Sequence, residues 1–328
     1  MGLTVAVTGP TGAIGTAAVS ALEQEPAVDR VIGMARRPFE PSSRGWTKTI
    51  YLQGDILDRD AVEALVANAD VVVHLAFVIM GSRKDSERVN LAGSRNVFEA
   101  CAAGARDRRP RRLVFTSSVA AYGYHSDNPV PLTEEVEPRG SPEHYYSRQK
   151  AACEAALAEI SSGSPLETFV LRPCIVAGPE AHILAEAMPW SHIPYVRTAI
   201  RVLPPLKPLV PDPGTPVQLV HHDDVAAAIA LAATTSAPPG AYNIAADGVL
   251  SVSDVVAALG GRPVPVPGFA ATATLTAIAR LPFLPAAAEW LQTMRTSVVM
   301  DTTKAKTLLG WTPRYSSAET LSALAASL

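Results

Sequence analysis

The sequence predicts an α/β fold in which a doubly wound parallel sheet is covered by helices on both faces. Two observations support this prediction. Short apolar runs, typical of buried parallel strands, alternate with helix-like stretches in the first half of the 328-residue chain. The first run, Leu3 to Val7, leads through the glycine-rich turn Thr8 to Gly15 into the Ala-rich segment Thr16 to Leu22, which gives the order strand, tight turn, helix.

The other elements of the first half follow in the same alternation. The strand candidates are Leu3 to Val7, Arg30 to Met34, Thr49 to Leu52, Val71 to Leu75, Leu113 to Ser117 and Thr168 to Leu171. The helical patterns between them include Arg59 to Val66, Asn90 to Ala103 and Tyr145 to Ile160. Because open parallel sheets bind ligands beyond the carboxyl ends of their strands, we expect the functional side chains at those ends.

The glycine-rich turn predicts a pyrophosphate-binding site. Its glycines permit a tight turn and a close backbone approach, so that N–H groups and the positive end of the helix dipole face the phosphates. A purely structural turn is the alternative. The candidate cofactor-binding residues of this turn are Gly9, Thr11, Gly12, Ala13, Ile14 and Gly15.

The sequence after Pro173 has a different texture, with many prolines and short segments in place of the regular alternation. We therefore expect a dinucleotide-binding domain over residues 1–173 and a mainly substrate-binding region over residues 174–328. Segments at about 215–246 are expected to return to the first domain. The C-terminal region is thus predicted to be smaller and irregular.

Composition excludes several classes of function. A net charge of −3 gives no reason to expect nucleic acid or an acidic membrane surface as partner. No secretory signal is recognisable, and arginine and proline interrupt even the apolar segment from Phe269 to Leu291. Cys101, Cys153 and Cys174 are too few and too scattered for a disulfide framework or a zinc site. A cytoplasmic protein without a metal fits best.

With these motifs in order, the chain resembles the extended short-chain dehydrogenase/reductase family, also described as epimerase/dehydratase-like. The resemblance covers nearly the whole chain and implies a Rossmann-type fold. Besides the glycine turn and Tyr146 to Lys150, it includes Gly54-Asp55-Ile56-Leu57-Asp58, His74-Leu75-Ala76, Asn90-Leu91-Ala92-Gly93, Thr116 to Gly123, Leu171-Arg172-Pro173, His222 to Ala226 and Leu309-Gly310-Trp311-Thr312-Pro313.

The resemblance implies a catalytic site of Ser118, Tyr146 and Lys150. Tyr146 would be the general acid/base, and Lys150, one helical turn further on, would be its electrostatic partner and a ligand of the nicotinamide ribose. A phenol has a pKa near 10, and a neighbouring ammonium favours its ionised form. Ser118 matches the hydroxyl that binds the substrate oxygen, with Ser117 and Thr116 as alternatives.

The cofactor class is predicted from the end of the second strand. An acidic residue there would bind the ribose hydroxyls of NAD, whereas arginine accommodates the 2′-phosphate of NADP. This chain has Arg36 and Arg37, which favours NADP, with NAD as the alternative. Asp55 resembles the acid that binds adenine, and a turn cap is its other interpretation. The resemblance adds as cofactor contacts Ile56, Leu75, Ala76, Tyr146, Lys150 and Pro173.

Departures from the family pattern indicate the substrate. Sugar 4,6-dehydratases carry Thr-Asp-Glu where this chain has Ser118-Val119-Ala120, so water elimination lacks its acid and base. Ile175 and Val217 replace an Asn and an Arg that face the pyrophosphate of nucleotide sugars, although Arg197 or Arg201 could restore that contact. The nearby sequence is apolar in Ala187 to Trp190, Val202 to Leu206, Phe269 and Leu275.

We therefore expect an NADP-dependent oxidoreductase that transfers hydride between nicotinamide and a carbonyl or alcohol of an apolar or aromatic small molecule. A nucleotide-sugar epimerase is the alternative, and a non-catalytic dinucleotide sensor is a third class. His221 to Asp224 matches a family element that begins a helix, so we expect no metal there. The resemblance also implies a homodimer through the helices at Asn90 to Ala103 and Tyr145 to Ile160.

Overall fold

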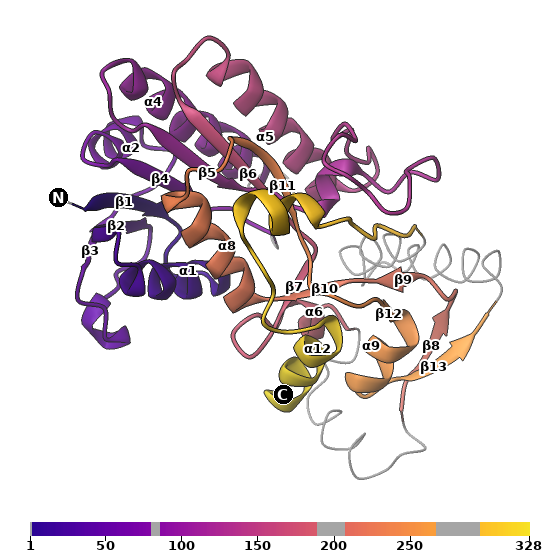
Figure 1. The fold of residues 1–328 in the computed structure, drawn as a ribbon. Coiled ribbons are helices and arrows are strands. Elements are labelled where there is room, and N and C mark those ends of the chain that lie inside the picture. The colour runs from indigo at the N-terminus through magenta and orange to yellow at the C-terminus, as the bar shows by residue number, and fades with distance from the viewer. Residues whose placement is uncertain (1, 80–85, 189–206, 267–295) are drawn as a thin grey trace.

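A seven-stranded parallel sheet forms the centre of the computed structural model, which describes residues 2–79, 86–188, 207–266 and 296–328. The strand order is β11-β6-β5-β4-β1-β2-β3, so the chain begins in the middle and extends the sheet to both edges (Figure 1). This order confirms the predicted doubly wound sheet. The strands are β1 (Leu3–Thr8), β2 (Val28–Ala35), β3 (Thr49–Gln53), β4 (Val71–His74), β5 (Arg112–Thr116), β6 (Glu167–Pro173) and β11 (Gly240–Ile244).

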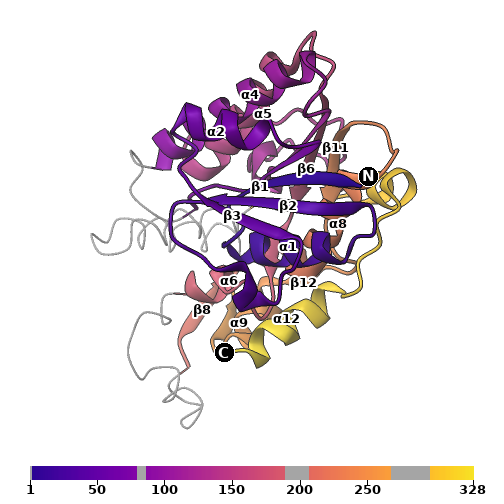
Figure 2. The same ribbon diagram turned by 90° about the vertical axis from the view of Figure 1, so that its left-hand side faces the viewer.

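Helices cover both faces of the sheet. One layer holds α2, α4 and α5, and the opposite layer holds α1 and α8 (Figures 1 and 2). The helices are α1 (Ala13–Gln24), α2 (Arg59–Val66), α4 (Ser94–Arg106), α5 (Tyr145–Ser161) and α8 (His222–Thr234). A π-helical segment, η2 (Arg88–Gly93), leads into α4, and the 3₁₀ segments η1 (Pro41–Arg44) and η3 (Val119–Tyr122) follow β2 and β5.

Alternation along the strands divides the core in two. On β1, Val5 and Val7 pack in the cluster that includes α1 and α8, whereas Ala6 packs in the cluster that includes α2, α4 and α5. Successive strand side chains point to opposite faces, so a sheet that is covered twice requires apolar residues at every position. This requirement explains why the sequence shows continuous apolar runs without alternating polar residues.

The part of the chain after β6 adds small elements beside the sheet, seen at the lower right of Figure 1. Pairs of strands form there: β7 with β10, β9 with β12 and β8 with β13. An apolar cluster that includes Leu184, Leu219 and Leu324 joins them to short helices. The bounds are β7 (Ile175–Ala177), α6 (Ile183–Glu186), β8 (Leu209–Asp212), β9 (Pro216–Val217), β10 (Leu219–His221), β12 (Leu250–Ser251), α9 (Val252–Ala258), β13 (Arg262–Pro265), η6 (Ala305–Leu309) and α12 (Ser317–Ala326).

None of the helices in the described residues combines the length and the apolar character that crossing a bilayer requires.

Candidate functional site

The glycine turn joins β1 to α1 through two close backbone contacts. Gly9 adopts φ +75°, and a Cβ atom there would lie 2.9 Å from the Ala76 nitrogen. A Cβ atom on Gly15 would lie 2.0 Å from the Gly9 carbonyl oxygen, which is far inside van der Waals contact. Both positions therefore require glycine, for conformation at Gly9 and for space at Gly15.

The same turn leaves the N-terminus of α1 open to an anion. Gly12 precedes the helix without a side-chain cap, and the first turn carries no acidic residue. Uncapped N–H groups at a positive helix end suit a pyrophosphate. A Cβ atom on Gly12 would come no closer than 3.7 Å to a described atom, so this glycine is not required by the packing of the protein itself. These residues fit a dinucleotide cofactor.

His74, the last residue of β4, connects β1 to α4. Its ring hydrogen-bonds to the Thr8 hydroxyl at 2.7 Å and to the Ser94 hydroxyl at 2.9 Å. Burial, together with the charge of Lys150, lowers the pKa of His74 to about 3, so the ring is neutral. Hydrogen bonds thus link β1, β4 and α4. They hold Leu75 and Ala76 at the carboxyl end of the sheet beside Gly9.

Arg36 and Arg37 directly follow β2, and both are exposed. The Tyr51 hydroxyl donates to the carbonyls of Ala35 and Arg37, and the Gln53 amide donates to the carbonyl of Arg36 at 3.0 Å. The backbone of this pair is thus held in place. Within the four described stretches of chain, neither guanidinium has an ion pair.

Asp55 makes a turn at the end of the third strand. Its carboxylate accepts from the Leu57 N–H at 3.0 Å, which is the turn-cap arrangement that the sequence left open as an alternative. Ile56 is buried, and its Cδ1 lies 2.5 Å from where a Cβ on Gly93 would be. Ile56 thus packs against η2. Pro173 ends β6 opposite Ile244 of β11, at the carboxyl edge of the same sheet.

Ser118 and Tyr146 meet through a hydrogen bond between their side chains. Tyr146 lies in the first turn of α5 and is 9% exposed. Burial raises the pKa of Tyr146 to about 12, although the Ser118 hydrogen bond acts in the opposite direction. Ser117 points elsewhere, because its hydroxyl donates to the buried Glu154. Between Ser117 and Ser118, it is Ser118 that pairs with Tyr146.

Lys150 extends beneath the same site from the second turn of α5. Its Nζ donates to the Thr116 carbonyl at 2.8 Å and lies 3.6 Å from the centroid of the Phe77 ring. Burial lowers the pKa of Lys150 to about 8. The ammonium lies 5.8 Å from the Tyr146 ring centroid. The raised pKa of Tyr146 therefore differs from the lowered one expected beside an ammonium, because desolvation of the phenol dominates.

A buried network behind the site was not predicted from the sequence. Arg172 donates to Glu154 through Nε and Nη2, with contacts of 2.6 to 3.2 Å, and to the Tyr122 hydroxyl at 2.9 Å. Burial alone would lower the pKa of Arg172, but the Glu154 carboxylate raises it overall. Tyr122 continues the network to Asn243 of β11 at 2.7 Å. The network fixes the backbone of β5, β6 and β11 around Ser117.

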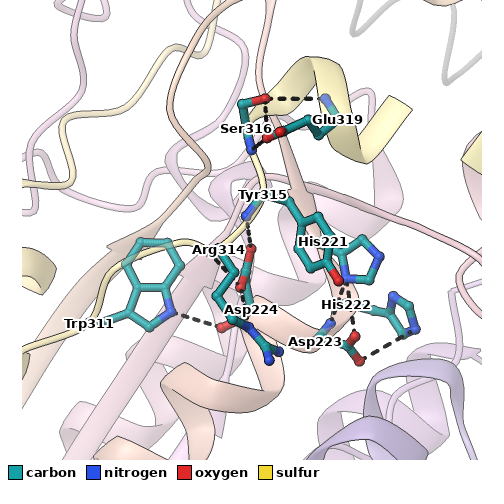
Figure 3. Close-up of polar contacts among 9 residues, drawn as sticks. All are labelled: His221, His222, Asp223, Asp224, Trp311, Arg314, Tyr315, Ser316 and Glu319. Carbon is teal, nitrogen blue, oxygen red and sulfur yellow. Dashed lines mark hydrogen bonds and ion pairs between the residues drawn. The ribbon is translucent and has the colours of Figure 1, made fainter. Parts of the chain in front are cut away.

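The motifs around Asp224 and Trp311, far apart in sequence, lie side by side in Figure 3. The buried Asp224 carboxylate accepts from the backbone N–H groups of Arg314 at 3.0 Å and Tyr315 at 3.1 Å. The Trp311 indole donates to the Asp224 carbonyl at 2.8 Å. Asp224 therefore fastens the C-terminal segment to α8.

His221, His222 and Asp223 place their possible ligand atoms within 4.8 Å of one another. His221 already has local roles, because its Nδ1 accepts from the Asp223 N–H at 3.2 Å and its ring stacks on Tyr315 at 4.1 Å (Figure 3). These contacts agree with a helix cap. That no metal binds here stays a prediction.

The residues predicted to shape the substrate site are described only in part. Ile175 and Val217 are half-buried and pack against an apolar cluster that includes Leu219. Ala187 and Met188 are also described, and Met188 is buried. Outside the described residues lie Pro189, Trp190, Arg197, Arg201, Val202 to Leu206, Phe269 and Leu275.

The model of the NAD dependent epimerase/dehydratase family matches residues 5–245. The chain belongs to this family. The family resemblance predicted from the motifs is thereby confirmed, and the protein belongs to a group of enzymes that use a nicotinamide dinucleotide. An uncharacterized protein of Mycobacterium tuberculosis is 26% identical over 325 residues, which cover 96% of this chain and 81% of the relative.

Other proteins are similar to this chain in sequence or in structure. Human 3 beta-hydroxysteroid dehydrogenase type 7 is 32% identical over 195 residues, which cover 55% of this chain and 52% of the human protein. The structure of UDP-glucose 4-epimerase from Thermotoga maritima with UDP-glucose has a TM-score of 0.72 at 21% identity, covering 99% of this chain and 98% of that one. The enzyme WbmG of Bordetella bronchiseptica with NAD has a TM-score of 0.70 at 19% identity, covering 100% and 94%. These likenesses establish the shared fold.

Proposed function

We propose that this protein is an NADP-dependent oxidoreductase that transfers hydride between nicotinamide and the carbonyl or alcohol carbon of an apolar or aromatic small molecule. The observation that carries the proposal is the Tyr146 hydroxyl, which is paired with Ser118 inside an aromatic cluster. Ala120 and Tyr145 form this cluster with Tyr146, and Phe77, Ile79 and Tyr124 pack against it. A proton donor in such surroundings favours an apolar carbonyl compound over a charged one.

The proposed chemistry assigns one task to each side chain. The glycine turn would hold the cofactor, which when bound would supply or accept the hydride, through Gly9, Thr11, Gly12, Ala13, Ile14 and Gly15. Ser118 binds the substrate oxygen, and Tyr146, protonated at neutral pH, donates its proton to that oxygen during reduction. Lys150 places a positive charge behind the site and binds the ribose. In the oxidative direction the ionised form of Tyr146 would accept the proton instead.

The apolar substrate class has support from two further observations. Ile175 and Val217 pack into an apolar cluster, where they offer no donor to a pyrophosphate. The human relative of 32% identity is a 3 beta-hydroxysteroid dehydrogenase, and its name denotes the oxidation of an apolar alcohol. The alternative, a nucleotide-sugar epimerase, is favoured by solved relatives that hold UDP-glucose. A cytoplasmic location and a homodimer through α4 and α5 remain predictions.

The preference for NADP is proposed from Arg36 and Arg37, whose exposed guanidiniums follow the second strand. We expect the protein to bind NADPH at least about tenfold more tightly than NADH. Replacing both arginines by glutamine should weaken NADPH binding about 10- to 100-fold and leave NADH binding unchanged. Isothermal titration measures both constants, and Arg30→Gln, at an exposed position near the start of β2, is the control. Equal loss for both cofactors would contradict the assignment.

Turnover distinguishes the proposed reaction from its alternative. We expect apolar ketones or aldehydes to oxidise NADPH in a one-to-one ratio, monitored by the loss of reduced-nicotinamide absorbance. UDP-glucose should give neither turnover nor a change in absorbance. Interconversion of UDP-sugars without net cofactor oxidation would instead favour the epimerase. If Tyr146→Phe left every measurable activity intact while the cofactor still bound, a dinucleotide sensor would be the better account.

A further inference from the structure

Phe77 lies directly after the His74-Leu75-Ala76 motif, at the carboxyl end of β4. It is half-buried and packs against the cluster of Ala120, Tyr145 and Tyr146. Its ring meets Tyr146 edge to face, with centroids 5.7 Å apart and an interplanar angle of 88°. The face of the same ring lies 3.6 Å from the Lys150 Nζ. One side chain therefore contacts two of the three residues assigned to catalysis, Tyr146 and Lys150.

The Lys150 ammonium has few polar partners in this position. Among the described residues, the Thr116 carbonyl is its hydrogen-bond acceptor. The ionisable groups around it are His74 on β4 and Tyr146, Cys153 and Glu154 on α5.

Cys153 and Glu154 act to raise the pKa of Lys150, but none of these described groups is hydrogen-bonded to the ammonium, which donates to the Thr116 carbonyl. His74 is neutral, and the Glu154 carboxylate is engaged by Arg172 and Ser117. Among the described residues three ring faces lie over the ammonium, with centroids at 3.6 Å for Phe77, 5.2 Å for Phe115 and 5.8 Å for Tyr146. Phe77 is the nearest of these rings, and a desolvated cation over a ring at this distance is strongly attracted.

We propose that Phe77 is the positioning residue of Lys150, holding the ammonium protonated between its ring face and the Thr116 carbonyl, where the proposed function needs it for the ribose and for Tyr146. The ring adds what a merely bulky side chain cannot supply, because the attraction depends on the π face. Leucine at this position would keep the apolar contact with Tyr146 and lose the charge contact. Tyrosine would keep both.

The pKa of Lys150 can be measured without any turnover. Burial holds this pKa at about 8, against 10.5 for an exposed lysine. Between these values the unfolded chain binds more protons than the folded one, so the stability of the protein relative to Lys150→Met rises with pH in this window. The pH at which that difference begins to rise marks the pKa of Lys150 in the folded state. Lys150→Gln provides a second uncharged reference.

The experiment compares wild type, Phe77→Leu and Phe77→Tyr, each with and without the Lys150→Met change, by urea unfolding from pH 6 to 11. In wild type and Phe77→Tyr we expect the rise to begin near pH 8. In Phe77→Leu it should begin about one unit lower, which is a tenfold loss of proton affinity. An onset in Phe77→Leu that coincides with wild type would overturn the proposal.

Cofactor titration gives an independent result at pH 7. We expect Phe77→Leu to bind NADPH several-fold more weakly than wild type and Phe77→Tyr to bind it equally well. Tighter binding by Phe77→Leu would mean that the ring obstructs the ribose, and would also overturn the proposal. If wild type reduced no carbonyl compound while the shift of the Lys150 pKa was observed, the proposed function would fail and the role of Phe77 would stand.

Discussion

Neighbouring hydroxyls at the end of β5 have separate tasks because α5 contacts them at different turns. Ser118 hydrogen-bonds to Tyr146 in the first turn, whereas Ser117 donates to Glu154 two turns further on. The Thr116 carbonyl accepts from Lys150 between them. The backbone after β5 thus distributes proton transfer, structural support and charge placement over three consecutive residues.

The two serines should respond differently to alanine. Ser118→Ala is expected to lower the kcat of reduction about 100-fold or more, because the substrate oxygen loses a donor, with little change in unfolding. Ser117→Ala removes a partner of the buried Glu154 and should cost about 1 to 3 kcal/mol of stability, with kcat retained. Kinetics and urea unfolding of both variants test this assignment. A loss of kcat confined to Ser117→Ala would reverse it.

At the scale of elements, the glycine turn and the Asp224 contacts show how distant segments are fastened together. Gly15 allows α1 to start against the Gly9 carbonyl, so the first strand and helix meet at a fixed angle. Asp224 holds the backbone at Arg314 and Tyr315, so the last part of the chain returns to α8. At Gly15 the Gly9 backbone is so close that a Cβ atom has no space. At Asp224 the short side chain places its carboxylate within hydrogen-bond distance of two backbone N–H groups.

Asp224→Asn tests the second contact. The amide keeps one acceptor oxygen for the two backbone N–H groups and loses the negative charge, so we expect a loss of about 1 to 3 kcal/mol in the free energy of unfolding. Asp223→Asn is the matched control, since the Asp223 side chain is 42% exposed and should change stability by less than about 0.5 kcal/mol. Chemical denaturation of both proteins provides the comparison. Equal stability of the two variants would refute a fastening role for Asp224.

Sequence patterns predicted the strands and helices of the first half well, because strands that are buried on both faces of a sheet consist of continuous apolar runs. The helix Arg59 to Val66 is observed with the same bounds, and the strand expected at Thr49 to Leu52 extends by one residue. β11 was not predicted as a strand, since its pairing with β6 depends on contacts across a long sequence separation. Glu154 and Phe77 escaped notice for the same reason, because their partners come from other elements.

At the scale of the molecule, the layered sheet brings the candidate residues together at one edge. The glycine turn and Ser118 lie at the carboxyl ends of β1 and β5, and His74 and Pro173 are the last residues of β4 and β6. The strands β1, β4, β5 and β6 are consecutive neighbours in the sheet. We propose that residues 1–173 form the dinucleotide-binding domain and residues 174–328 the mainly substrate-binding region. Within the second part, β11 completes the central sheet. The site would then lie where the two parts meet.

The central claim, net hydride transfer to an apolar carbonyl compound, is tested most directly with NADPH in which both hydrogens at C4 of the nicotinamide are replaced by deuterium. We predict that each molecule of alcohol product gains one deuterium as one NADP⁺ forms, measured by mass spectrometry and absorbance, and that Tyr146→Phe abolishes the transfer while still binding NADPH. Deuterium-free product, or turnover of a UDP-sugar with the cofactor returned to its starting state, would contradict the account.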